Sequence, residues 1–68
     1  MPVITVKLAK GRTNEQKQHF VEVVTNEAVK TLNVKEEWVT VIFDEYDRDN
    51  WATGGQLHST KFGEGFGK

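Results

Sequence analysis

The sequence predicts an α+β fold in which one helix connects two parallel strands. A run of alternating β-branched residues covers positions 3–9, apolar residues then recur at helical spacing as far as Leu32, and a second strand-like run covers 38–46. A strand, a helix and a strand in 68 residues imply a right-handed crossover, which makes the two strands parallel. A chain of this length is expected to form a single domain over residues 1–68.

The first strand is predicted from the segment VITVKLA. Ile4, Val6 and Leu8 fall on one face of it, and Thr5 and Lys7 fall on the other. The polar triplet at 10–12 is expected to end this strand.

The helix is predicted to start after Thr13, because Thr13 and Gln16 match the capping-box pattern. Asn33 is a suitable stop, since asparagine tolerates the left-handed conformation at a helix C-terminus. The apolar face is expected to consist of residues at three- and four-residue spacing: Phe20, Val21, Val24, Ala28 and Leu32.

The second strand is predicted over 38–46, with sequence WVTVIFDEY, followed by a polar turn at 47–50. Gly54 and Gly55 are expected to form a turn. The Gly-rich tail, 61–68, is expected to be loosely ordered.

Association with other subunits is expected because a chain this short buries little surface of its own. Cysteine is absent and the two histidines, His19 and His58, are far apart in the sequence. Disulfides are therefore excluded and a structural zinc site is not expected, which leaves oligomerisation as the remaining source of stability. A two-stranded sheet with one helix would also leave strand edges exposed, with unpaired backbone groups that can pair with another chain.

The charge pattern argues against nucleic-acid and membrane partners. Nine basic and ten acidic residues are interspersed and give a net charge of −1, without the basic stripe of a nucleic-acid-binding protein. The apolar runs are too short to span a bilayer, and no signal-peptide pattern is present. A cytoplasmic location is the corresponding expectation.

Most familiar catalytic patterns are missing. Gly54-Gly55 does not lead from a strand into a helix, and no orienting carboxylate accompanies the adjacent His58 and Ser59, so nucleotide-binding and hydrolase interpretations are weak. Pro2 is the exception. Removal of Met1 would give Pro2 a free secondary amine, and burial of such an amine beside a guanidinium lowers its pKa towards the range of a general base at neutral pH.

The segments PVITVKLAKGRTNEQKQ and EYDRDNWATGGQL resemble the 4-oxalocrotonate tautomerase family, and the resemblance extends from Pro2 to about Leu57. It implies β-α-β subunits with a short C-terminal hairpin that pair into dimers and build a hexamer, a trimer of dimers. It also implies cofactor-free and metal-free keto–enol tautomerisation of a small enol or dienol carboxylate such as 2-hydroxymuconate.

The resemblance assigns roles to individual residues. Pro2 falls on the catalytic base, Arg12 on an arginine that a neighbouring subunit supplies to bind a substrate carboxylate, and Trp51 on the aromatic wall of the pocket. Thr40 occupies the position of the family's second arginine, and the nearest candidate to replace that charge is Arg48 in the following turn.

Two alternatives stay open. The presence of Met1 and of Thr40 in the sequence is compatible with a catalytically silent oligomeric binding subunit of the same fold. A proline-dependent decarboxylase or dehalogenase of the same superfamily is the other alternative, although no water-activating group is evident beside Pro2.

Overall fold

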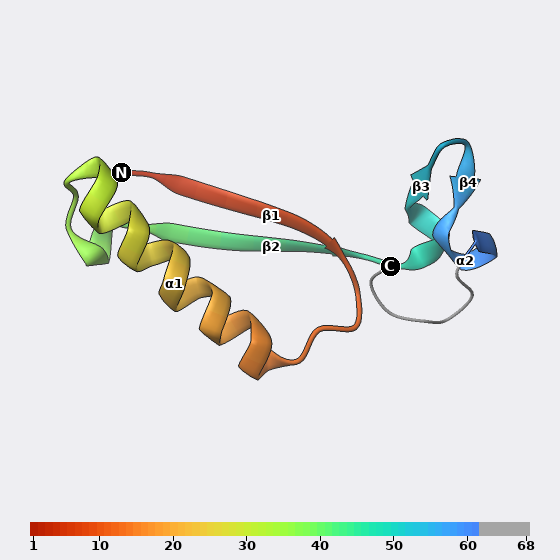
Figure 1. Ribbon diagram of the computed structural model, residues 1–68, viewed down its shortest axis with the longest axis horizontal. Coiled ribbons are helices and arrows are strands. Elements are labelled where there is room, and N and C mark those ends of the chain that lie inside the picture. The colour runs from red at the N-terminus through yellow and green to blue at the C-terminus, as the bar shows by residue number, and fades with distance from the viewer. Residues whose placement is uncertain (62–68) are drawn as a thin grey trace. The chain divides into compact units, whose positions relative to one another are not determined.

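The structure is a computed structural model that describes residues 1–61 (Figure 1). Its contacts group the chain into two compact units that share the two long strands. The first unit comprises Met1–Val6 and Arg12–Ile42, and the second comprises Lys7–Gly11 and the described chain from Phe43 onward. The elements in chain order are β1 (Val3–Ala9), α1 (Asn14–Leu32), the 3₁₀ helix η1 (Glu36–Trp38), β2 (Thr40–Tyr46), the 3₁₀ helix η2 (Arg48–Asn50), β3 (Ala52–Thr53), β4 (Gln56–Leu57) and α2 (His58–Lys61).

Strands β1 and β2 pair into a two-stranded parallel sheet. At one end the N–H of Thr40 donates to the carbonyl of Pro2 at 3.1 Å, and at the other the N–H of Lys10 donates to the carbonyl of Tyr46 at 2.9 Å. Both strands therefore run in the same direction, and the predicted α+β class with its β-α-β order is confirmed.

Helix α1 begins and ends where the sequence predicts. The Oγ1 of Thr13 accepts from the N–H of Gln16 at 3.1 Å, and the Oε1 of Gln16 accepts from the N–H of Thr13 at 2.9 Å, which completes the capping box. Asn33 ends the helix in the left-handed conformation, with φ 55° and ψ 52°. Within the first unit, Figure 1 shows α1 beside the first halves of the two strands.

The predicted apolar face of α1 is only partly correct. Ala28 is buried and Val21 and Val24 are half-buried, whereas Phe20 and Leu32 are 43% and 55% exposed. Position 20 lies about 100° around the helix from position 21, so both cannot face the same direction. The helix consequently has a packed stripe, formed by Val21, Val24 and Ala28. Beside it lies an exposed apolar stripe, formed by Phe20 and Val23.

The second strand begins two residues later than the expected 38. The N–H of Trp38 donates to the carbonyl of Lys35 at 3.0 Å, and that of Val39 donates to Glu36 at 3.1 Å, so these groups are used in a local 3₁₀ turn. The ammonium of Lys35 also lies 5.3 Å from the centre of the Trp38 ring. These local contacts hold Trp38 in η1, outside the sheet.

The C-terminal hairpin is present, with Ala52 opposite Leu57 and Thr53 opposite Gln56. Gly54 and Gly55 connect its arms with φ of 62° and 81°, which is the backbone of a tight two-residue hairpin turn. The polar turn at 47–50 contains η2, and α2 follows the hairpin although no helix was predicted there. Apart from Lys61, which ends α2, the Gly-rich tail at 61–68 lies outside the described residues.

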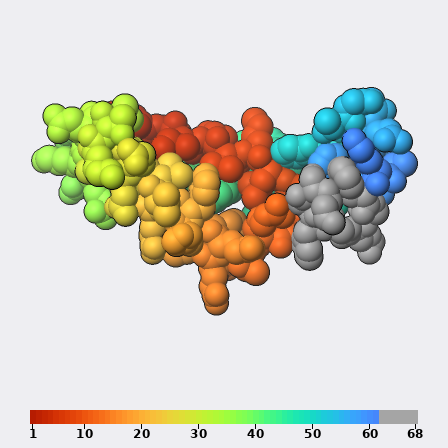
Figure 2. Space-filling view, in the orientation of Figure 1, coloured from red at the N-terminus to blue at the C-terminus, as the bar shows by residue number. Residues whose placement is uncertain are grey.

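The interior of the described chain is small. Ala28 is its only apolar residue that is more than nine-tenths buried, at 7% exposure. In Figure 2 the side chains of α1, coloured orange to yellow-green, lie at the surface on the side facing the viewer. Several large apolar side chains of the first unit remain at least two-fifths exposed: Val3, Phe20, Val23, Leu32, Trp38 and Ile42.

Candidate active site

Pro2 and Thr40 lie together at the start of the sheet. Pro2 directly precedes β1 and is half-buried, while Thr40 begins β2 and is exposed. The hydrogen bond from the Thr40 N–H to the Pro2 carbonyl joins them. The structure thus brings the expected base next to the residue that stands at the second arginine position.

Arg12 follows the other end of β1 and is half-buried. The preceding Gly11 has φ 131°, a conformation that side chains other than glycine rarely adopt, and it lets the chain turn between the strand and the capped helix. The seven residues of β1 separate Pro2 from Arg12, a length of about 23 Å at 3.3 Å per residue. An arginine side chain does not bridge that distance, so one chain does not bring these two side chains together.

Arg48 and Trp51 are both in the second unit, at the two ends of η2. The N–H of Trp51 donates to the carbonyl of Arg48 at 3.4 Å, and the Nη2 of Arg48 donates to the carbonyl of Lys10 at 3.5 Å. Both residues are half-buried. The Arg48 guanidinium is therefore anchored to the backbone of the second unit.

Trp51 belongs to an aromatic cluster with Tyr46 and His58. The centroid of the Trp51 ring lies 6.1 Å from that of the Tyr46 ring, in an edge-to-face arrangement. It lies 5.9 Å from the centroid of the His58 ring, at an interplanar angle of 49°. Edge-to-face and tilted ring pairs are the favoured geometries for aromatic contacts. His58 is 8% exposed and is the only buried polar residue in the described chain.

No site role is predicted for His58 from the sequence, because a histidine after a hairpin has no pattern that marks it as buried. Its backbone N–H donates to the carbonyl of Trp51 at 2.7 Å, and its Nε2 lies 3.3 Å from the Oγ1 of Thr53. The only available signal was the histidine's position at the end of the predicted hairpin, seven residues after the expected aromatic wall.

A polar cluster in the second unit extends from Tyr46. The Nζ of Lys7 donates to the Tyr46 hydroxyl at 3.2 Å and to Oδ2 of Asp44 at 3.1 Å, and it lies 5.6 Å from the centre of the Tyr46 ring. The hydrogen bond to Tyr46, and after it the one to Asp44, raise the pKa of Lys7 above its ordinary 10.5. Lys7 is therefore a cation throughout the neutral range.

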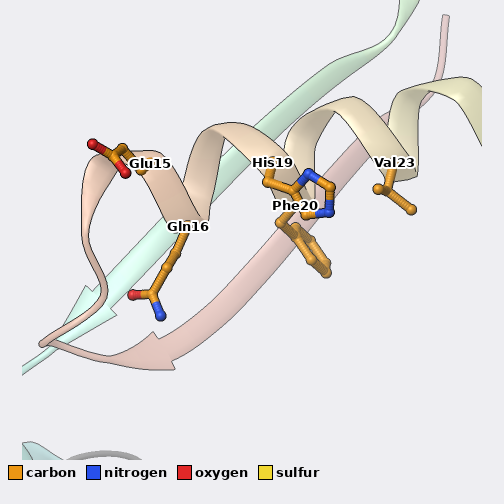
Figure 3. A pocket seen from close by; sticks show the side chains of 5 residues that line it. All are labelled: Glu15, Gln16, His19, Phe20 and Val23. Atoms are coloured by element: carbon orange, nitrogen blue, oxygen red, sulfur yellow. The ribbon is translucent and has the colours of Figure 1, made fainter.

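A shallow hollow on α1 is formed by five neighbouring side chains. It is lined by Glu15, Gln16, His19, Phe20 and Val23, all from the helix, as Figure 3 shows. None of these residues is among the expected site residues. The exposed Phe20 and Val23 make it an apolar surface feature of the first unit.

The described residues offer no cluster of three or more His, Asp or Glu side chains that could hold a metal ion. None of the helices within residues 1–61 combines the length and apolar character needed to cross a lipid bilayer.

Several solved structures superpose on this fold, and 4-oxalocrotonate tautomerase homologues are among them. A 4-oxalocrotonate tautomerase isozyme from Methylibium petroleiphilum superposes with a TM-score of 0.86 and 31% identity, covering 90% of this chain and 95% of that one. DmpI from Helicobacter pylori superposes with a TM-score of 0.81 and 37% identity, covering 94% and 100%. The fold is therefore that of the small β-α-β isomerases.

Sequence comparison leads to the same family. The family model described as "Tautomerase enzyme" matches residues 2–61. The 2-hydroxymuconate tautomerase of Bacillus subtilis is 41% identical over 56 residues, which cover 82% of this chain and 90% of that protein. The chain belongs to the tautomerase family, whose members are isomerases that interconvert keto and enol forms.

Proposed function

We propose that the chain, once Met1 has been removed, is a cofactor-free keto–enol tautomerase acting on a small enol or dienol carboxylate such as 2-hydroxymuconate. The observation that carries this proposal is the family match, which begins at residue 2 and continues through the hairpin. The relative from Bacillus subtilis is named for 2-hydroxymuconate, which makes that dienol the first substrate to test.

Pro2 acts as the general base in this proposal. A free α-amino group titrates at about pH 7.7–8, so a modest lowering of its pKa leaves much of it uncharged at neutral pH. The uncharged nitrogen accepts the proton of the enol hydroxyl, the C–O bond becomes a carbonyl, and the diene electrons shift towards the far carbon. The resulting ammonium then returns the proton to that carbon, which restores the base.

Arg12 binds the substrate carboxylate, and it does so in the active site that contains the Pro2 of a neighbouring subunit. The length of β1 between the two residues supports this arrangement, because it separates them by more than a side chain reaches. A guanidinium offers two parallel donors to a carboxylate and stays charged at every working pH. When it also faces developing negative charge, it stabilises the transition state more than the ground state.

Trp51 forms the apolar wall of the pocket. Its indole is half-buried and its ring contacts with Tyr46 and His58 hold it in a defined environment. An apolar wall excludes water from the reacting amine and thereby disfavours its ammonium form.

The active species is a homo-oligomer, a hexamer built as a trimer of dimers. The described chain has one buried apolar residue and many large exposed ones, including Val3, Val23 and Ile42. Exposed apolar surface of this extent on a small subunit favours burial against other copies.

The proposal is tested by mass spectrometry of the N-terminus followed by an ultraviolet assay of 2-hydroxymuconate ketonisation. Pro2→Ala should lower kcat by about 10²-fold or more, in line with the usual contribution of a general base. Arg12→Ala should raise KM through the lost carboxylate contact and lower kcat through the lost transition-state stabilisation. Lys30→Met, which removes an exposed cation paired with Glu27, should change neither constant. Equal rates for the processed protein and Pro2→Ala would remove Pro2 from the mechanism.

A silent binding subunit is the second candidate, and Thr40 is the observation that favours it, because a neutral side chain stands beside Pro2 where the resemblance places an arginine. A processed chain that ketonises no enol and whose Pro2 does not react with a halopropiolate would support this candidate over the tautomerase.

A further inference from the structure

The Trp51 indole contacts two other rings of the second unit. The Tyr46 ring centroid lies 6.1 Å from that of Trp51, with an interplanar angle of 63°, and the His58 ring centroid lies 5.9 Å from it. Of these three rings, His58 is the most deeply buried, at 8% exposure. A buried imidazole next to an aromatic wall restricts the orientations that the wall can adopt.

His58 is itself fixed by the hairpin. Its backbone N–H donates to the Trp51 carbonyl at 2.7 Å, which sets the spacing between the two residues. Its Nε2 lies 3.3 Å from the Oγ1 of Thr53, the last residue of β3 before the two-glycine turn. A threonine hydroxyl donates or accepts, so this contact is available to either tautomer of the ring.

These contacts connect both arms of the hairpin to one imidazole. Thr53 ends the first arm, and His58 follows the second. Movement of the imidazole away from the indole would break its contact with the Thr53 hydroxyl and lose its ring contact with Trp51.

We propose that His58 is a positioning residue that holds the Trp51 indole in one orientation against Tyr46. The role of Trp51 as the pocket wall rests on the proposed function, whereas the hold that His58 has on Trp51 does not. The hairpin therefore acts as a clamp that prepares the wall before substrate binds, and this reduces the ordering that binding would otherwise require.

Fluorescence of Trp51 tests the clamp directly. Trp38→Phe removes the other tryptophan, which is 41% exposed and has no role in the site, so Trp51 becomes the sole indole reporter. In this background His58→Ala should raise the acrylamide quenching constant of Trp51 by about twofold or more, since an aromatic contact of this kind shifts a local equilibrium by about two- to tenfold.

Two matched variants separate the ring from its polar anchor. His58→Phe keeps a ring against the indole and should return the quenching constant close to that of Trp38→Phe alone. Thr53→Val keeps the side-chain shape but removes the hydroxyl, and should give an intermediate value. Circular dichroism of each variant checks that the fold is kept, and Thr53→Val and His58→Phe carry the test if His58→Ala does not fold.

Kinetics of the same variants separate the clamp from the proposed function. His58→Ala should raise KM severalfold with a smaller change in kcat, because a loosened wall weakens substrate binding more than proton transfer. An unchanged quenching constant in both His58→Ala and Thr53→Val would overturn the positioning role. A raised quenching constant with unchanged KM would keep the positioning role and overturn Trp51 as the pocket wall.

Discussion

Thr40 donates its backbone N–H to the carbonyl of Pro2 at 3.1 Å, which places the start of β2 directly beside the proposed base. The resemblance to 4-oxalocrotonate tautomerases puts an arginine at this position. Thr40 is exposed and uncharged, so this end of the sheet has room for a longer side chain but supplies no cation of its own at that position.

Thr40→Arg should therefore improve the turnover of a dicarboxylate. A charge-assisted hydrogen bond contributes about 1.5–3 kcal/mol, which corresponds to a gain of about 10- to 100-fold in kcat/KM. The ultraviolet assay would compare 2-hydroxymuconate with an enol that has one carboxylate, and the gain should be confined to the dicarboxylate. Thr40→Val is the matched control and should leave both substrates unchanged. An equal gain for both substrates would show that the new arginine acts in some other way.

The capping box of α1 should contribute measurably to stability. Thr13→Ala removes the acceptor of the Gln16 N–H and should lower the free energy of unfolding by about 1 kcal/mol. Thr31→Ala provides the control, because Thr31 is also an exposed threonine but lies inside the last turns of the helix and donates to Glu27. Chemical denaturation at equal protein concentration would give both values. If the two substitutions lower the free energy of unfolding equally, the capping box does not contribute more than an ordinary threonine of the helix.

Local sequence signals were sufficient where local chemistry decides the structure. Thr13, Gln16 and Asn33 set the ends of α1, and Gly11 permits the turn before it, because each acts through its own backbone or that of a residue within one turn. The parallel sheet also followed, since a strand-helix-strand order in a short chain leaves few other arrangements.

The remaining features depend on contacts that no local pattern encodes. Trp38 is an aromatic residue with high strand propensity, yet hydrogen bonds in the 35–39 turn hold it in η1. Phe20 looks like a core residue in the sequence, but burial depends on which helix face meets the sheet. The burial of His58 arises from its packing beside Trp51 and Thr53, which only the folded hairpin brings together.

The Lys7 cluster should give the protein an alkaline limit to its stability. The pKa of Lys7 is raised in the folded state, so its stabilising contribution is fully present below the ordinary pKa of 10.5 and is lost as pH rises through the folded pKa. Melting temperatures of the native protein and Lys7→Met should therefore differ by a constant amount between about pH 6 and 9 and converge as the pH rises above 10.5.

Tyr46→Phe sharpens this test, because it keeps the aromatic ring and the lysine but removes the hydroxyl that raises the lysine pKa most. The alkaline loss of stability should become smaller in this variant. An alkaline loss of the same size would assign the effect to a group other than this pair.

The exposed apolar stripe of α1 should be required for subunit association. Phe20→Glu places a charge in the hollow that Phe20 forms with Val23, and should shift the sedimentation coefficient towards smaller species. Gln18→Glu adds the same charge on the same helix at an exposed polar position whose amide donates to Glu22, and should leave the assembly intact. Equal behaviour of the two variants would place the subunit contact elsewhere.

Ala28 is the only enclosed apolar residue of the described chain, and this has a practical consequence for every thermal comparison between variants. When a subunit relies on its neighbours for most of its burial, unfolding and dissociation become a single equilibrium, and the midpoint moves with the molarity of the sample. Dilution would then melt the protein at a lower temperature without any change in its sequence.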